Sequence, residues 1–493
     1  MNLVGIDTLA KAPLAEGDVL IGGRWRAAED GRTFPVYDPA TGELLREVSA
    51  AGPADARDAI DAASAAAAQW RATPARHRSE ILHRGFTLMR EHTDTLARLI
   101  VGENGKAYRD AAAEVGYAAE FFRWFAEEAV RIGSSFGDAP GGGYRHVVRR
   151  HPVGVTAFVT PWNFPAAMAT RKIAPALAAG CPVLLKPAPE TPLTALAVAA
   201  LLAEAGLPDG LLNVLPTDRA PEVVSAWLSD ERVRKFSFTG STATGKLLLE
   251  QAASNVVNVT MELGGNAPFV VCADADVDAA VRGAMDAKMR GGGEVCIAAN
   301  RFYVHTSVAA EFTEKFGAAM TAVRTGPGLE DGVTLGPMVN QAAVDKIRSL
   351  VDDAVERGAK VVARGEVPDG PGHFHPATVL VDVPDDARIF HEEVFGPVAP
   401  LTTFTDEDEM LERANATVHG LASYVYTSDV ARGLRLAERL EAGMVGLNRG
   451  LLSDPAAPFG GVKQSGLGRE GGREGVEAFL ETQYVALDWP TSG

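Results

Sequence analysis

Two kinds of segment alternate along the chain from residue 153 onward. Short runs of β-forming apolar residues are separated by longer runs with helical character. Strands are predicted at Val153–Val159, Pro182–Lys186 and Arg234–Phe238, and helices at Ala166–Ala179, Leu193–Ala205 and Thr244–Ala253. This alternation is typical of βαβ units and indicates a largely parallel sheet.

A second block of the same kind begins at Pro268–Cys272 and continues to Met444–Asn448. The loop Glu262–Gly265 separates the two blocks, so we expect two α/β layers with this loop between them. Upstream of both, the glycine-rich segment Gly137–Gly143 predicts a turn before a strand over Tyr144–Arg150.

Further upstream, apolar residues recur at intervals of three and four, as they do along one face of an amphipathic helix. This predicted face contains Val115, Ala118, Phe122, Phe125 and Ala129.

Composition places the chain among ordinary globular proteins. Its 493 residues, 46% hydrophobic and 23% charged, are enough for two or three domains with large cores. The formal net charge of −17 disfavours nucleic acid and anionic membrane surfaces as partners. No apolar run reaches the roughly 18 residues of a membrane span, and Met1–Lys11 lacks the pattern of a signal peptide. Three cysteines are too few for a disulfide framework, which favours a reducing cytoplasm.

The most informative local feature is Cys296, which follows the glycine run 291–293. A lone cysteine is more often a small buried hydrophobe, but glycines beside a thiol pack poorly and let a ligand approach the backbone. Glu262 lies between two apolar residues, which raise the pKa of a carboxyl toward that of a useful base, unless the side chain simply faces solvent. A thiolate adds to a carbonyl carbon, and a base activates the water that later releases the acyl group. The pair therefore indicates covalent chemistry on a carbonyl compound.

The segment from Gly240 to Lys246 has the glycine spacing of a phosphate-binding loop. Leu247 occupies the place of the Ser or Thr that would bind magnesium, which argues against an ATPase, and no metal site is expected. The segment is either a plain strand-to-helix turn or a place where amides at a helix start hold a pyrophosphate. The usual Gly-x-Gly-x-x-Gly fingerprint does not follow an early strand.

Several further segments, in the right order along the chain, resemble a known family. They are Ile21–Trp25, Thr160–Pro165, Phe238–Thr242, Glu392–Pro397 and Pro458–Gly461. With the segments around Glu262 and Cys296, they resemble the aldehyde dehydrogenase superfamily over nearly the whole chain, and within it most closely the succinate-semialdehyde dehydrogenases. The resemblance implies an α/β fold with two Rossmann-like parallel sheets and a small β element for oligomerisation.

The resemblance also implies the domain boundaries. A dinucleotide-binding domain is expected over 1–130 and 153–264, a catalytic domain over 265–465, and an oligomerisation element over 131–152 and 466–493. In that element, the predicted hairpin joins a final strand at Glu481–Leu487. A homodimer or homotetramer is expected.

By this resemblance, Cys296 is the nucleophile that forms a thiohemiacetal and then a thioester, and Glu262 activates the hydrolytic water. The Asn163 side-chain amide and the Cys296 backbone N–H form the oxyanion hole. A catalytically silent structural protein with this fold is disfavoured because all three residues are present. Two departures from the family pattern lie near the thiol. Glu294 replaces the usual Gln and either raises the thiol pKa or points away, and Ala298 replaces the second Cys of many succinate-semialdehyde dehydrogenases.

The resemblance implies NAD or NADP as the cofactor. Lys186 is expected to contact the adenosine ribose, and Pro189 stands where NAD-preferring members often have Glu. The missing carboxylate removes a repulsion toward a 2′-phosphate, which gives NADP a slight preference. The implied cofactor-binding residues are Thr160, Trp162, Lys186, Pro189, Gly240, Ser241, Gly245, Leu263, Glu393 and Phe395.

The prediction of the substrate depends on Arg171, Arg290 and Ser453. Most arginines lie at the surface with their stems on apolar groups. In succinate-semialdehyde dehydrogenases, however, these residue types at these motif positions bind the distal carboxylate of the substrate. The resemblance therefore implies NAD(P)-dependent oxidation of succinate semialdehyde, or a close homologue, to the acid. Glutarate semialdehyde and an uncharged aldehyde are the alternative substrates.

Overall fold

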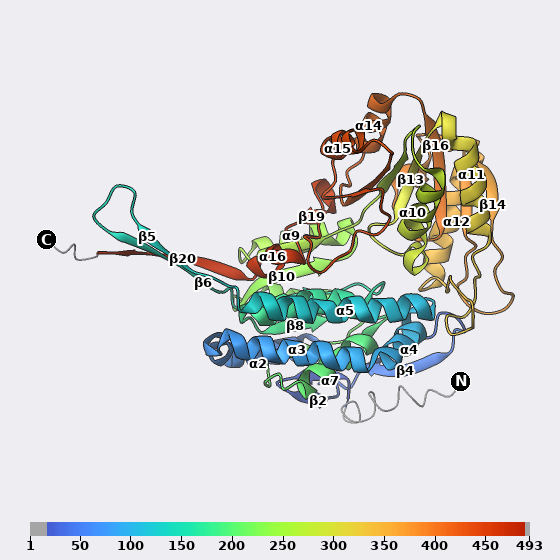
Figure 1. Ribbon diagram of the computed structural model, residues 1–493. Helices are drawn as coiled ribbons and strands as arrows, with labels where there is room; N and C mark the ends of the chain where they lie inside the picture. The colour runs from blue at the N-terminus through green and yellow to red at the C-terminus, as the bar shows by residue number, and fades with distance from the viewer. Residues whose placement is uncertain (1–16, 489–493) are drawn as a thin grey trace.

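The computed structural model describes residues 17–488, and Figure 1 shows two α/β bodies with a narrow extension. The first body contains a sheet with the strand order β19-β11-β10-β7-β8-β9-β1-β2. Its strands from β11 to β9 are parallel, whereas β19 and β1 pair antiparallel on either side of them. The strands are β1 (Val19–Ile21), β2 (Arg24–Arg26), β7 (Val155–Val159), β8 (Val183–Lys186), β9 (Leu212–Val214), β10 (Val233–Thr239), β11 (Asn258–Glu262) and β19 (Gly466–Leu467).

Helices cover both faces of this sheet because its central strands are apolar on both sides. In β7, Val155, Ala157 and Val159 belong to one core cluster, whereas Phe158 belongs to another. The helices of the first cluster are α2 (Pro53–Ala72), α8 (Ala220–Leu228) and α9 (Thr242–Ala253). Those of the second are α3 (Ala75–Glu91), α4 (Thr93–Asn104), α5 (Tyr108–Ala129), α6 (Pro165–Ala179) and α7 (Pro192–Glu204).

The second body contains a sheet with the order β14-β15-β16-β13-β12-β17-β18, parallel except for β14 at one edge. The chain enters it from β11 through residues 263–266. Its strands are β12 (Ala267–Val271), β13 (Ala299–His305), β14 (Lys360–Arg364), β15 (Thr378–Val381), β16 (Val398–Phe404), β17 (Ala422–Tyr426) and β18 (Met444–Leu447). Its helices are α10 (Val277–Met289), η2 (Arg290–Gly293), α11 (Thr306–Thr321), α12 (Gln341–Glu356), α13 (Arg388–His391), α14 (Glu407–Asn415) and α15 (Val430–Arg439).

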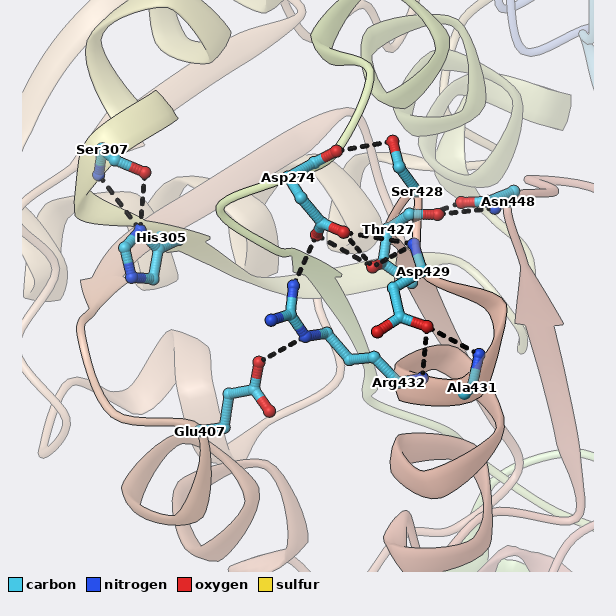
Figure 2. A network of polar contacts seen from close by, with 10 residues as sticks. All are labelled: Asp274, His305, Ser307, Glu407, Thr427, Ser428, Asp429, Ala431, Arg432 and Asn448. Carbon is cyan, nitrogen blue, oxygen red and sulfur yellow. Dashed lines mark hydrogen bonds and ion pairs between the residues drawn. The ribbon is translucent and has the colours of Figure 1, made fainter.

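A network of polar side chains closes the carboxyl ends of β12, β17 and β18 (Figure 2). The Asp274 carboxylate accepts from Thr427 Oγ1 (2.8 Å) and pairs with Arg432 (2.8 Å), which also binds Glu407 at 3.1 Å. The Asn448 side chain exchanges two hydrogen bonds with the backbone of Thr427 (2.9 and 3.0 Å). This end of the second sheet is therefore fastened by side chains that bind each other.

The extension is a three-stranded antiparallel sheet in the order β20-β6-β5, which projects from the first body in Figure 1. Its strands are β5 (Ser135–Asp138), β6 (Arg145–Pro152) and β20 (Leu480–Leu487). Gly137 and Asp138 pair with β6, so the turn is shorter than the predicted Gly137–Gly143. The remaining elements are β3 (Thr33–Tyr37), β4 (Leu44–Ser49), η3 (Lys463–Ser465) and α16 (Gly472–Glu477).

The predicted fold class is confirmed. Each predicted βαβ element is present, with bounds that differ by one or two residues. The predicted apolar face of α5 is also confirmed, because all five of its residues are buried. Among the helices of residues 17–488, none has the length and apolar character to span a membrane. The prediction about Met1–Lys11 lies outside the described residues.

Candidate active site

A cavity of about 400 Å³ is lined by segments from both bodies. Residues 161–164 follow β7, while 239–241 and 262–264 lie at the ends of β10 and β11. Ligands of open α/β sheets bind at such carboxyl ends of strands. The predicted site residues that line this cavity are Trp162, Asn163, Arg171, Gly240, Ser241, Glu262, Leu263, Arg290, Cys296, Glu393, Phe395 and Ser453.

Four predicted cofactor residues lie outside the lining. The Thr160 amide donates to the Lys186 carbonyl (3.1 Å) and so continues the pairing of β7 with β8. The Lys186 ammonium donates to the Pro187 carbonyl (2.9 Å), and burial lowers its pKa to about 8. Pro189 is half-buried three residues later. A Cβ at Gly245 would collide with the Leu263 side chain, so glycine there allows Leu263 to pack against the start of α9.

The loop before Cys296 requires its glycines. Gly291, Gly292 and Gly293 have φ values of 53°, 68° and 79°, in the left-handed region that side chains disfavour. A Cβ at Gly293 would also collide with the Gly396 carbonyl. The run thus forms a compact turn that places Cys296, partly exposed, on the cavity wall. Burial raises the pKa of its thiol to about 12, although the charge of Arg171 acts in the opposite direction.

Asn163 is fixed beside this loop from both its side chain and its backbone. Its side-chain Nδ2 donates to the Glu294 carbonyl (2.8 Å), which leaves the second N–H of that amide available. Its backbone carbonyl accepts from the buried Lys106 ammonium (2.6 Å), which pairs with Glu114 at 2.6 Å. Glu114 in turn accepts from the amide of Ala166 (2.9 Å) in the first turn of α6. Buried ion pairs of this kind fix geometry more surely than they add stability.

The buried side chain of Glu294 has a raised pKa. Its Oε1 accepts from the Val339 amide (3.2 Å), and burial raises its pKa to about 8. At pH 7 the neutral acid is therefore favoured. A neutral acid can imitate the Gln side chain that the resemblance implies at this position, and it places no negative charge near the thiol.

Glu262 is buried at the end of β11, and neither carboxylate oxygen has a hydrogen-bond partner among the described residues. Desolvation, followed by the negative charge of Glu470, raises its pKa well above the ordinary value. An unpaired buried carboxyl is costly and is a common sign of a functional group. Within residues 17–488, no group of three or more His, Cys, Asp or Glu side chains could hold a metal ion.

A second buried charge cluster lies behind Glu262, and the sequence did not reveal it. Glu470 accepts from the Lys172 ammonium and from Ser237 Oγ (3.3 Å), and it lies 3.7 Å from Arg171 Nη1. Lys172 directly follows Arg171 in the sequence, but nothing in the local pattern indicates a partner 298 residues away.

The predicted substrate residues meet on another part of the wall. Arg171 is 2% exposed; its Nη2 donates to Tyr117 Oη (2.6 Å), and its guanidinium lies 4.1 Å from the Phe459 ring centroid. Arg290 is half-buried, and its Nη1 donates to Ser453 Oγ (3.1 Å). The Arg290 guanidinium lies 5.5 Å from the Tyr117 ring centroid. The three predicted residues are therefore joined by Tyr117, which sequence reasoning missed.

Glu393 and Phe395 line the cavity near the first sheet. Glu393 Oε1 accepts from the Gly265 amide (3.2 Å), and burial raises its pKa to about 7. Phe395 has a φ of 52° and packs edge-on against Trp162, with ring centroids 5.4 Å apart. A non-glycine residue in this conformation stores strain, which is most frequent at functional sites.

Comparisons with known proteins agree with these features. A model of the aldehyde dehydrogenase family matches residues 25–485. A succinate-semialdehyde dehydrogenase from Paenarthrobacter nicotinovorans is 52% identical over 91% of this chain and 99% of its own, and a 3-sulfolactaldehyde dehydrogenase from Pseudomonas putida is 48% identical over 96% and 97%. The crystal structure of an NADP-dependent enzyme from E. coli has a TM-score of 0.94 and 47% identity, and the match covers 96% of this chain and 98% of that one. The chain therefore belongs to the aldehyde dehydrogenase family.

Proposed function

We propose that this enzyme oxidises a short aldehyde with a distal carboxylate, succinate semialdehyde or a close homologue, to the acid. The observation that carries the proposal is one cavity with two sets of groups. The reaction cluster, Cys296, Glu262 and Asn163, supplies a nucleophile, a base and a hydrogen-bond donor. The anion cluster, Arg171, Arg290, Ser453 and Tyr117, surrounds an acid group with positive charge and hydroxyls.

In the first half of the reaction, the Cys296 thiolate adds to the aldehyde carbon. The carbonyl oxygen becomes an oxyanion, which accepts from the second N–H of Asn163 and from the Cys296 backbone N–H. When bound, the nicotinamide cofactor accepts the hydride that leaves this thiohemiacetal. Loss of the hydride leaves an acyl group on Cys296 as a thioester.

In the second half, the Glu262 carboxylate takes a proton from water, and the resulting hydroxide attacks the thioester carbon. The tetrahedral adduct collapses, the C–S bond breaks, and the acid leaves while Cys296 regains its thiolate. This step suits Glu262 because no group among residues 17–488 forms a hydrogen bond with its carboxylate oxygens. The negative charge of Glu470 raises the pKa of Glu262 and makes it a stronger base, while the cations Lys172 and Arg171 act in the opposite direction.

Members of this family use NAD or NADP, and the residues present fit either. The first turn of α9 opens next to Gly240, and its free amides suit a pyrophosphate. Glu393 suits ribose hydroxyls. We propose a slight preference for NADP because Pro189 offers no carboxylate, and Pro189→Glu should shift the kcat/KM ratio toward NAD. A wild type that does not use NADP at saturation would contradict this preference.

Steady-state kinetics with a panel of aldehydes tests the substrate class. Succinate semialdehyde, glutarate semialdehyde, 3-sulfolactaldehyde and butanal should each be measured with both cofactors. We expect succinate semialdehyde to exceed butanal at least about 10-fold in kcat/KM, since hydrogen bonds to charged groups contribute roughly 1.5–3 kcal/mol each. Glutarate semialdehyde tests whether a longer chain fits the cavity, and 3-sulfolactaldehyde tests whether a sulfonate fits in place of a carboxylate. Equal kcat/KM for butanal would refute the proposal.

We also propose that the β5-β6-β20 extension assembles the enzyme into a homodimer or homotetramer. Antiparallel strands with exposed edges invite pairing with another chain, and Phe136 and Tyr484 are exposed on this sheet. Light scattering of the purified protein tests the oligomer. The three cysteines are free thiols, which supports a cytoplasmic location.

A further inference from the structure

Helix α5 presents a second stripe of residues toward the active site. Asp110, Glu114, Tyr117 and Phe121 follow intervals of four, three and four residues, so they share one helix face. Asp110 accepts from the Gly291 amide (2.9 Å) in the turn before Cys296, and Glu114 holds the start of α6. Tyr117 is the member of this stripe that lines the cavity.

The Tyr117 hydroxyl has a fixed role toward Arg171. A guanidinium can only donate hydrogen bonds, so in the 2.6 Å contact the phenol oxygen accepts from Arg171 Nη2. The phenol hydrogen must then point elsewhere, and no described residue accepts it. Donation from a cation also withdraws electron density from the oxygen and strengthens the phenol as a donor. The cavity therefore faces a hydroxyl that is ready to donate.

Arg171 itself is poorly placed to meet an anion directly. Its side chain is buried under Phe459, its Nη2 is bound to Tyr117, and its Nη1 faces Glu470 at 3.7 Å. Arg290 is different because it is half-buried and, among the described residues, its side chain makes one hydrogen bond, from Nη1 to Ser453. Both guanidiniums lie near the same phenol ring, with the Arg171 guanidinium 5.8 Å and the Arg290 guanidinium 5.5 Å from its centroid.

We propose that Tyr117 is a specificity-determining residue that donates its phenol hydrogen to the distal anionic group of the substrate, beside Arg290. Arg171 acts through Tyr117, as a positioning residue that orients and polarises the hydroxyl. The inference rests on the proposed function, because it needs a substrate with an acid group. Hydroxyl and guanidinium donors bind carboxylate and sulfonate alike, so the substrate panel distinguishes the two.

The test compares Tyr117→Phe with Tyr108→Phe. Both variants remove one hydroxyl from the same helix, but the Tyr108 hydroxyl donates to the exposed Asp94 and lies outside the cavity lining. Tyr117→Phe should lower kcat/KM for succinate semialdehyde about 10- to 100-fold, mainly through KM, and leave butanal unchanged. The inhibition constant of succinate, the product, should rise by a similar factor. Tyr108→Phe should match the wild type in each assay.

A second readout separates donation to the substrate from simple support of Arg171. The charge of Arg171 favours the Cys296 thiolate, so a displaced Arg171 would move the pH profile of Cys296 alkylation by iodoacetamide to higher pH. The other two cysteines are buried and should not interfere. An unchanged alkylation profile in Tyr117→Phe supports the inference. A shifted profile, or equal losses for succinate semialdehyde and butanal, overturns it. If the wild type shows no preference for succinate semialdehyde over butanal, this inference and the proposed function are both overturned. If the wild type prefers succinate semialdehyde and Tyr117→Phe keeps that preference, only this inference is overturned.

Discussion

The reaction cluster and the anion cluster share one cavity, but they are held in place by different kinds of contact. Backbone groups fix the reaction cluster: three left-handed glycines place Cys296, and the Glu294 carbonyl orients Asn163. Side chains fix the anion cluster, through the Arg171–Tyr117 and Arg290–Ser453 hydrogen bonds. Backbone geometry survives most substitutions, whereas side-chain contacts change with each one. We therefore expect most substitutions to leave the chemistry of the reaction cluster unchanged, whereas substitutions in the anion cluster should change which substrate is preferred.

The largest expected effect tests whether the reaction cluster serves every substrate. Cys296→Ala should lower the turnover of acidic and uncharged aldehydes alike by at least about 10³-fold, because no other cysteine lines the cavity. The measurement is kcat for succinate semialdehyde and butanal, with Cys272→Ala as a matched control in the core. Residual turnover of either aldehyde near the wild-type level would mean that Cys296 is not the nucleophile.

A smaller effect should separate the two steps of the reaction, acylation of Cys296 and hydrolysis of the thioester. Glu262→Gln keeps the size of the side chain but removes the base, so acylation should proceed while hydrolysis slows about 10²- to 10⁴-fold. Rapid mixing should show one equivalent of reduced cofactor formed in a burst, and mass spectrometry should find the acyl group on Cys296. Unchanged steady-state turnover without a trapped acyl-enzyme would contradict this assignment.

The anion cluster should respond differently to its two arginines. Arg290→Ala should cost about 10- to 100-fold in kcat/KM for succinate semialdehyde, mostly as a raised KM, with little change for butanal. Arg171→Ala should harm both substrates, because Glu470 loses a neighbouring cation and the thiol loses a favourable charge. If both variants lose the same factor in kcat/KM for both aldehydes, the anion cluster does not act independently of the reaction cluster.

The smallest effect concerns the preference between the two aldehydes as the pH changes. Burial raises the pKa of the Cys296 thiol and of the Glu262 carboxyl, and in the proposed mechanism both groups act in their deprotonated forms. Each deprotonated fraction grows as the pH rises, up to tenfold per unit below the pKa, so kcat/KM should increase through the alkaline range. The guanidiniums of the anion cluster stay charged in this range. The ratio of kcat/KM for succinate semialdehyde to kcat/KM for butanal should therefore stay constant between pH 7 and about 9. A ratio that changes steeply would place a titrating group in the anion cluster.

Local patterns were sufficient to predict the parallel sheets and much of the reaction cluster. Strand and helix periodicities require only neighbouring residues, and the glycine run before Cys296 encodes its turn through φ values that other residues disfavour. The fastening of the second sheet by Asp274 and Arg432 was not predicted, because its members come from four separate segments, at residues 274, 407, 427–432 and 448.

The sequence by itself determined that a thiol, an acidic residue and two arginines belong to one chain with this fold. Only the tertiary structure decided how they are used. The stripe of α5 that contains Tyr117 and its apolar stripe both follow intervals of three and four residues in the sequence. Which of the two stripes faces a cavity depends on how α5 packs against α6 and η2. Arg171 matched a substrate-binding position, yet its Nη2 donates to Tyr117 and its Nη1 lies 3.7 Å from Glu470, 299 residues later in the chain. Hydrogen bonds and desolvation are set by what surrounds a group in space, and a local pattern does not contain that information.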